Sequence, residues 1–372
     1  MNDHCSLGVI GCGDVAYRRY FPALDTAAPR GRIVACCDAR AESADRAATY
    51  LRKRGYGTQS YTDFEAFLQH PDLDAVVNLT PVSCHFALNL AVLEAGKHVY
   101  CEKPLGDTPD EAQSLIDAAK RQELLLMSAP AVMATARFAW LRTVLADGLI
   151  GQPTVITAQF GNLGPAAWDE YTGDPVAFYR ADVGPMRDQG IYLLHGITGL
   201  LGPATRVQAM SARTIPSRTV LYGGRAGEQF DIETDDVVSL QLQFDGAAIA
   251  QVLSSVAIPA TRVPIMEIHG SAGTISIADF LVANNAVELF SVDDQAAWPQ
   301  GWSQVVPEGP ASPTNDLIGL GAVHFVQCLV GEQEPRLIPE HALHVMEIMA
   351  AAQTSALEGR AVDLTGAVWK PE

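Results

Sequence analysis

Short apolar runs alternate with predicted helical segments up to about residue 130. Each run ends at glycine, proline or a polar residue, which is typical of buried strands in a parallel sheet. Strands that alternate with helices in this way predict a parallel, doubly wound sheet. The predicted strands cover residues 6–10, 32–37, 74–79, 99–101 and 124–127, with a further short strand at Tyr61.

The pattern changes after Ala129-Pro130. A predicted helix over residues 135–146 is followed mainly by strands, several of which alternate apolar and polar side chains and end in short turns such as Asp245-Gly246. This alternation predicts a mostly antiparallel sheet with one covered face. Its predicted strands cover residues 154–160, 206–214, 236–244, 247–256, 263–269, 273–277 and 287–290, and further helices cover residues 188–201, 315–330 and 339–357.

The length of 372 residues fits two domains. We therefore expect an α/β protein with an N-terminal Rossmann domain over residues 1–130. A C-terminal α+β domain with a mostly antiparallel open sheet is expected over residues 131–372. Its last helices could pack back on the first domain.

Composition and charge narrow the class of protein. The chain is 48% hydrophobic and 18% charged, as in ordinary globular proteins, and its formal net charge is −18. This negative charge argues against nucleic acid and anionic membranes as partners. The N-terminal residues lack the basic and apolar regions of a secretory signal, and the apolar runs are too short to span a membrane, so we expect a cytoplasmic location. Seven cysteines without a Cys-x-x-Cys pair predict reduced thiols that are mostly buried in or beside core strands.

A glycine-rich turn follows the first predicted strand. The stretch Gly11-Cys12-Gly13-Asp14-Val15-Ala16 has the Gly-x-Gly-x-x-Gly/Ala spacing of a dinucleotide-binding turn. The first glycine makes the turn, the second lets a pyrophosphate approach the backbone, and the small third residue allows close helix packing. The pyrophosphate would lie at the helix N-terminus, so Gly11, Gly13, Asp14 and Val15 are predicted cofactor contacts.

An acidic residue ends the second predicted strand. Asp38 lies about 20 residues past the glycine turn, where a carboxylate binds the ribose 2′-hydroxyl of NAD and repels the 2′-phosphate of NADP. Arg40 lies close enough in sequence to hold that phosphate, so NADP stays possible. The alternative is that Asp38 caps the helix predicted over residues 41–53.

The strand over residues 99–101 ends at Glu102-Lys103-Pro104. The carboxyl ends of the strands in an open parallel sheet form its ligand-binding edge. A lysine fixed at this edge can donate a proton or bind a substrate oxygen. The alternative is a surface strand end with an ordinary lysine.

The predicted helix over residues 188–201 carries a second group of polar side chains. Asp188 and Tyr192 are four residues apart and share a helix face, and His195 follows three residues later. A tyrosine is a poor base at pH 7 unless a cation such as Lys103 lowers its pKa. The alternative places Tyr192 and His195 in the core and makes Asp188 a helix cap.

Taken together, these motifs resemble the glucose–fructose oxidoreductase / inositol dehydrogenase / MocA-like (Gfo/Idh/MocA) family over nearly the whole chain. The resemblance rests on the following segments: Gly11-Cys12-Gly13, Asp38, Thr80-Pro81 with His85, Gly96-Lys97-His98-Val99 running into Glu102-Lys103-Pro104, and Asp188-Gln189-Gly190-Ile191-Tyr192.

The resemblance implies an NAD(P)-linked oxidoreductase acting on a sugar, inositol or related polyol. It adds Thr80, Pro81, His85, Glu102 and Lys103 to the cofactor contacts. Lys103 matches the catalytic lysine of the family and Asp188 its motif aspartate. Tyr192 holds the position that is His in inositol dehydrogenase-like members and Tyr in glucose–fructose oxidoreductase-like members. The candidate substrate contacts are Trp168, Tyr179, Arg180 and His195.

In the expected reaction, Tyr192 exchanges the hydroxyl proton, Lys103 stabilises the developing alkoxide and Asp188 orients them. The resemblance also implies a homodimer or homotetramer formed through the C-terminal sheet. Two alternatives are an enzyme that recycles a tightly bound NAD(H), and a non-catalytic regulator that senses a dinucleotide or a sugar. We expect no metal site, because His341 and His344 lack a third ligand nearby and are expected on a helix surface.

Overall fold

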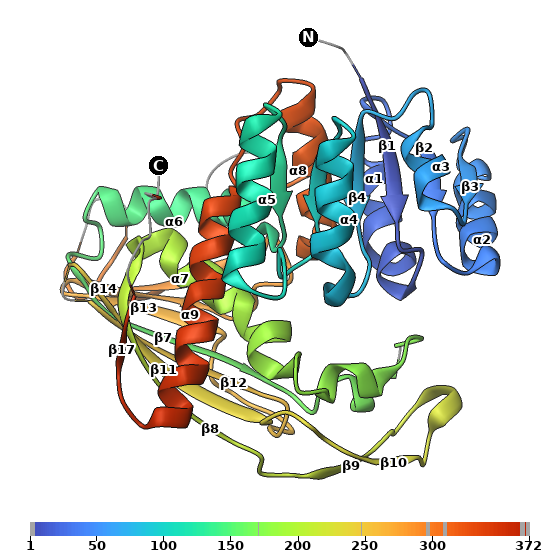
Figure 1. Cartoon of the computed structure of the whole chain (residues 1–372). Coiled ribbons are helices and arrows are strands. Elements are labelled where there is room, and N and C mark those ends of the chain that lie inside the picture. Colours follow the sequence, from blue (N-terminus) through green and yellow to red (C-terminus); the bar gives the residue numbers. More distant parts are fainter. Residues whose placement is uncertain are drawn as a thin grey trace. The chain divides into compact units, whose positions relative to one another are not determined.

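A computed structural model describes residues 4–169, 171–246, 248–294, 298–307, 311–364 and 369. The chain divides into two compact units, which are described separately here (Figure 1). The first unit comprises Met1–Ala134 with Ser312–Leu343, and the second comprises Thr135–Ala311 with His344–Glu372.

The first unit is built on a six-stranded parallel sheet, as the sequence predicted. Its strand order is β3-β2-β1-β4-β5-β6, the order of a dinucleotide-binding Rossmann sheet. Each neighbouring pair is parallel. The strands are β1 Cys5–Ile10, β2 Gly31–Cys37, β3 Gln59–Tyr61, β4 Ala75–Asn78, β5 His98–Cys101 and β6 Leu126–Ser128.

Helices connect these strands, and local sequence sets their ends. Helix α5 shows how: the Thr108 hydroxyl accepts a hydrogen bond from Glu111 N, and Pro109 occupies the first turn. The helix after the glycine turn ends at Asp25. The helical segments of this unit are η1 Ala16–Tyr20, α1 Phe21–Asp25, α2 Ala41–Arg52, α3 Phe64–Leu68, α4 Val82–Glu94, α5 Pro109–Arg121, η2 Ala131–Ala134 and α8 Leu317–Leu329.

The second unit is built on a nine-stranded sheet of order β16-β15-β14-β13-β7-β12-β11-β8-β17. Only β7 and β12 pair in parallel, so the sheet is mostly antiparallel, as predicted. Burial alternates along β8 and β11, which is the period of a sheet with one covered face. The strands are β7 Pro153–Gly161, β8 Ala204–Ala212, β11 Val237–Phe244, β12 Ile249–Ser255, β13 Met266–Gly270, β14 Gly273–Ile277, β15 Val287–Ser291, β16 Gly301–Val305 and β17 Val362–Asp363.

Helix α7 and the second-unit part of α9 run across this sheet (Figure 1). The helical segments are α6 Ala136–Ala146, η3 Pro165–Ala167, η4 Pro175–Tyr179, η5 Met186–Gly190, α7 Ile191–Leu201, η6 Gly223–Arg225 and α9 Pro339–Glu358. In the described ranges, no helix is both long and apolar enough to cross a membrane.

A two-stranded arm, which the sequence analysis missed, leaves the sheet of the second unit. It pairs β9 Ser217–Thr219 with β10 Gln229–Asp231. Each strand has three residues, too few to show an alternating pattern.

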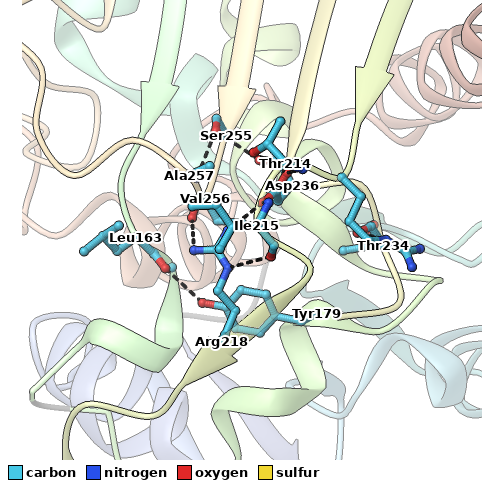
Figure 2. A network of polar contacts seen from close by, with 12 residues as sticks. Leu163, Tyr179, Thr214, Ile215, Arg218, Thr234, Asp236, Ser255, Val256 and Ala257 are labelled. Atoms are coloured by element: carbon cyan, nitrogen blue, oxygen red, sulfur yellow. Dashed lines mark hydrogen bonds and ion pairs between the residues drawn. The ribbon is translucent and has the colours of Figure 1, made fainter. Parts of the chain in front are cut away.

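A buried ion pair anchors the arm to the sheet (Figure 2). Arg218 on β9 donates to the fully buried Asp236 carboxylate over 2.7 Å and to the Val256 carbonyl over 2.8 Å. Asp236 also accepts from Thr214 N at 2.6 Å and from Ile215 N at 2.9 Å. Burial alone would raise the pKa of Asp236, but these hydrogen bonds hold it below its ordinary value.

Candidate active site

The carboxyl ends of four neighbouring strands bring the predicted cofactor residues to one edge of the Rossmann sheet. Gly11 follows β1 with a φ of +85°, where a side chain would be strained. A Cβ at Gly11 would also lie 2.8 Å from the Leu79 carbonyl. By contrast, a Cβ at Gly13 would meet nothing within 4 Å. The backbone at Gly13 therefore faces open space, which fits the approach of a pyrophosphate to this turn.

Asp38 joins the end of β2 to the glycine turn. Its Oδ2 accepts a hydrogen bond from Cys12 N at 2.9 Å, and its Oδ1 accepts one from Arg40 N at 2.9 Å. The alternative of a helix cap does not hold, because the N-cap residue of α2 is Arg40. Arg40 Nε lies 3.7 Å from Asp38 Oδ1 on a largely exposed side chain, so a cation is available beside this carboxylate.

The helix after the glycine turn begins with a π-helical segment, η1. Val15 is its N-cap residue, and Phe21 N donates to Ala16 O, a five-residue step. Asp14 pairs with Arg18 over 3.4 Å. Single π turns occur often at functional sites, and this one was not predicted from the sequence.

Tyr20, at the end of η1, holds the Glu102-Lys103 loop. Its hydroxyl donates to Glu102 Oε1 over 2.6 Å, and Lys103 N donates to Glu102 Oε2 over 2.8 Å. Burial and the nearby Glu102 raise the pKa of Tyr20 well above its ordinary value, so its phenol stays neutral. The sequence analysis did not identify Tyr20. Tyr20 could have been found from its spacing, because a residue four positions after Ala16 lies on the same packed face of the helix.

The turn after β4 is tied to the same loop. Thr80 N and its hydroxyl donate to Asn78 Oδ1 over 3.1 and 2.7 Å, and Pro81 is the N-cap residue of α4. From α4, the buried His85 places Nδ1 2.7 Å from the carbonyl oxygen of Pro104 and Nε2 2.8 Å from that of Thr80. The Lys103–Pro104 peptide bond is cis.

In the second unit, Asp188 and Tyr192 lie on one continuous helical segment formed by η5 and α7. Gly184 precedes it with a φ of +67°, and Ile191 N donates to Met186 O across a second π-helical turn. The N-cap residue of η5 is Pro185, so Asp188 lies inside the helical segment and is not its cap. Asp188 is half-buried and Tyr192 is buried, with the Tyr192 ring centroid 6.4 Å from that of Phe160.

The candidate substrate residues differ in exposure. Arg180 is exposed and Trp168 half-buried, its ring edge-on to Tyr171 at 6.1 Å. Tyr179 is 1% exposed and donates to the Leu163 carbonyl over 3.0 Å (Figure 2). Its hydroxyl also accepts from Ala166 N. A substrate could reach the Tyr179 hydroxyl only by displacing these contacts.

Buried histidines on α7 and α9 include His195, His341 and His344. Burial, together with the neighbouring His344, lowers the pKa of His195 to about 3, so its ring is neutral. His344 Nε2 accepts from Ala204 N over 3.0 Å. The expectation that His341 and His344 lie on a helix surface is wrong: each is 1% exposed, because both occupy the packed side of α9. Among the described residues, no group of three or more His, Cys, Asp or Glu side chains could hold a metal ion.

Sequence comparison matches both units to one family. The model of the oxidoreductase family with an NAD-binding Rossmann fold (GFO_IDH_MocA) matches residues 5–129, and that of the GFO/IDH/MocA C-terminal domain matches residues 138–276. A dTDP-3,4-didehydro-2,6-dideoxy-alpha-D-glucose 3-reductase from Streptomyces violaceoruber is 32% identical over 222 residues, which is 59% of this chain and 61% of that protein.

A more distant relative is aligned over more of the chain. The D-apiose dehydrogenase of Paraburkholderia graminis is 26% identical over 370 residues, 96% of this chain and 88% of that protein. An NAD binding oxidoreductase from Klebsiella pneumoniae has the same fold, with a TM-score of 0.81 and 22% identity over 98% of this chain and all of that chain. From the two matched domains and the Rossmann order of its first sheet, the chain belongs to the Gfo/Idh/MocA family of NAD-binding oxidoreductases.

Proposed function

We propose that this protein is an NAD(P)-dependent oxidoreductase that transfers a hydride between nicotinamide and a carbinol or carbonyl carbon of a sugar, inositol or related polyol. The observation that carries the proposal is the shared edge of the first sheet. There the glycine turn, the Asp38 carboxylate and the clamped Lys103 loop follow neighbouring strands. The sugar is suggested by the names of the Streptomyces and Paraburkholderia relatives.

The residues at this edge fit a dinucleotide. The open space at Gly13 would admit the pyrophosphate, with Gly11, Asp14 and Val15 forming the rest of the turn. Asp38 would bind the ribose hydroxyls, and its negative charge favours NAD over NADP. The residues proposed to line the nicotinamide half are Thr80, Pro81, His85, Glu102 and Lys103. When bound, the nicotinamide supplies or takes up the hydride.

The chain's own residues would handle the proton. Tyr192 would exchange the hydroxyl proton of the substrate, and the Lys103 ammonium would donate a hydrogen bond to the same oxygen and stabilise its developing charge. Asp188 would orient these groups. Because Lys103 belongs to one unit and Asp188 and Tyr192 to the other, their joint action is part of the proposal.

Among the candidate substrate residues, Trp168 is half-buried and Arg180 is exposed. We propose them as contacts for the apolar face and the hydroxyl groups of a sugar. Tyr179 and His195 are left out of this proposal, because both side chains are buried and the Tyr179 hydroxyl donates to the Leu163 carbonyl.

A panel of aldoses and polyols tested against NAD and NADP, read by the absorbance of the reduced cofactor, tests this function. We expect turnover with at least one sugar or polyol and a preference for NAD. A protein that binds NAD but is inactive across the panel would contradict the proposal and favour the sensing regulator. Tightly bound NAD(H) in the isolated protein, without net reduction of added cofactor, would favour the recycling enzyme.

We also propose a homodimer or homotetramer that forms through the outer face of the nine-stranded sheet. On this face the exposed residues Gln208, Gln241 and Gln251 lie opposite one another on neighbouring strands. Met210 and Ile249 are exposed on the same sheet. Such a mixed polar and apolar surface suits a subunit interface. Sedimentation equilibrium should give a dimer or tetramer that Ile249→Asp shifts toward monomer; a monomeric parent protein would contradict this interface.

A further inference from the structure

His85 has a carbonyl oxygen against each of its ring nitrogens. Nδ1 lies 2.7 Å from Pro104 O and Nε2 lies 2.8 Å from Thr80 O. A carbonyl oxygen only accepts hydrogen bonds, whereas a neutral imidazole has one N–H to donate. A neutral ring can therefore satisfy one of these contacts, and a charged ring can satisfy both.

The two carbonyls belong to different parts of the cofactor edge. Thr80 lies in the turn after β4, and that turn is already held by the bonds from Thr80 to Asn78. Pro104 directly follows Lys103, in the loop after β5. On the N-terminal side, the backbone N–H of Lys103 donates to the Glu102 carboxylate. The Tyr20 hydroxyl donates to the same carboxylate and holds it in place. His85 therefore supplies the second of two anchors that flank Lys103.

Burial makes the histidine anchor stiff. His85 is 1% exposed, so water cannot readily replace it at either carbonyl. By contrast, Thr80 is half-buried, and its turn is also held by the hydrogen bond from the Thr80 hydroxyl to Asn78. Loss of the ring would thus free the Pro104 side of the Lys103 loop more than the Thr80 turn.

We propose that His85 is a positioning residue for Lys103, acting through an Nδ1–H that donates to the Pro104 carbonyl. This inference rests on the proposed function, in which the Lys103 ammonium must meet a substrate oxygen. When His85 takes up a proton, its Nε2–H can also donate to the Thr80 carbonyl. The ring then connects the turn after β4 to the loop after β5 by two hydrogen bonds. No direct contact of His85 with substrate is needed.

The charges around the ring set when the second bond forms. Burial lowers the pKa of His85, while the two carbonyls and the carboxylates of Glu102 and Asp107 act in the opposite direction. At neutral pH the lowered pKa leaves the ring mainly neutral, and the Nδ1–H tautomer is the one that holds Pro104.

Two amide substitutions separate the two contacts. The Asn side-chain amide reaches about as far as Nδ1 of a histidine, and the Gln amide about as far as Nε2. His85→Asn keeps a donor for Pro104, and His85→Gln keeps one for Thr80. We expect His85→Gln to lower kcat by about 10-fold to 100-fold, the scale of a misplaced acid/base group, and His85→Asn to lower it by about 10-fold less than His85→Gln. NAD affinity should change less than kcat in His85→Gln.

His98→Gln is the matched control. His98 is the first residue of β5 and its Nδ1 accepts from Leu125 N over 2.9 Å, so this substitution removes a ring-nitrogen hydrogen bond at the end of β5 opposite the Lys103 loop. We expect it to lower the melting temperature without changing kcat. Equal kcat values for His85→Asn and His85→Gln, or a similar loss of kcat in His98→Gln, would overturn the proposal.

The tautomer of His85 tests the inference without any turnover. In a ¹⁵N-labelled protein at pH 7, the donor and acceptor ring nitrogens of a neutral histidine resonate far apart, and their couplings to the ring protons assign them. Donation from Nδ1 supports the proposal, whereas a ring protonated only at Nε2 overturns it. If the parent protein is inactive across the sugar panel but shows the Nδ1–H ring, the function fails and the tie to Pro104 stands.

Discussion

The Arg218–Asp236 ion pair is expected to dominate the stability of the arm and of the sheet end to which it is bound. Arg218→Met removes the cation and leaves the Asp236 carboxylate, which is fully buried, with its hydrogen bonds from Thr214 and Ile215 alone. It also removes the donor that reaches the Val256 carbonyl. Breaking a buried pair on one side costs about 3–5 kcal/mol. We therefore expect the free energy of unfolding of the second unit to fall by that amount.

Tryptophan fluorescence suits this measurement. The chain has five tryptophans, and all belong to the second unit, so urea unfolding followed by their emission reports on that unit: Trp140, Trp168, Trp298, Trp302 and Trp369. Arg225→Met is the control, because Arg225 is a more exposed arm arginine paired with Asp174 and Glu228. Exposed ion pairs contribute little, so its unfolding midpoint should stay close to that of the parent.

A double-mutant cycle isolates the charge from the side-chain packing. Asp236→Asn removes the negative charge and keeps one acceptor oxygen, which can serve the N–H of Thr214 or that of Ile215. In the Arg218→Met/Asp236→Asn variant the buried charge is gone, so the two losses should fall short of additivity by more than about 1 kcal/mol. A loss below about 1 kcal/mol in Arg218→Met, or strict additivity, would refute the assignment of this pair as the anchor of the arm.

Three further results are expected. Asp38→Ala should weaken NAD binding and relax discrimination against NADP, measured by titrating both cofactors, because the ribose acceptor and its charge are lost; unchanged NAD affinity would rule out the contact. Gly13→Ala should bind NAD about 10-fold or more weakly with an unchanged melting temperature, since the added methyl enters open space in the apo protein; equal affinity would show that the pyrophosphate does not approach there. Stability should fall as the pH drops below about 6.5, because burial holds the pKa of His195 at about 3 and of His324 at about 4 while the unfolded histidines take up protons first. The loss of stability should grow until the pH passes below these folded-state pKa values. His324→Gln should remove the part of this pH dependence that comes from His324. Urea midpoints that do not change between pH 7 and pH 4.5 would contradict the prediction.

The sequence was sufficient to predict the fold where local pattern decides structure. The apolar runs ending at Gly11, Asp38 and Glu102 predicted parallel strands whose ends share one edge, and β1, β2 and β5 end there. Patterns of this kind are local, so they can be recognised without knowing which strands are neighbours in the sheet.

Contacts between distant residues could not be read in the same way. Tyr20 and Glu102 are 82 residues apart, and Arg218 and Asp236 are 18 apart. The sequence around each of these residues does not indicate which distant residue it contacts. The two π-helical turns escaped prediction because a one-residue change in hydrogen-bond register leaves no periodic signal. The burial of His341 was misjudged for a related reason, since a polar residue on a packed helix face is recognised only from what covers it.

Comparison of Lys103→Ala with the parent protein, using NAD and the best substrate from the sugar and polyol panel, tests the central claim most directly. Lys103 follows β5 with its backbone N–H bound to Glu102 and the next carbonyl bound to His85, so the backbone that carries its ammonium group is anchored on both sides. The proposed role predicts unchanged NAD affinity and a loss of turnover of more than about 100-fold. Turnover within a few-fold of the parent, at equal cofactor saturation, would contradict the role of Lys103 in the reaction.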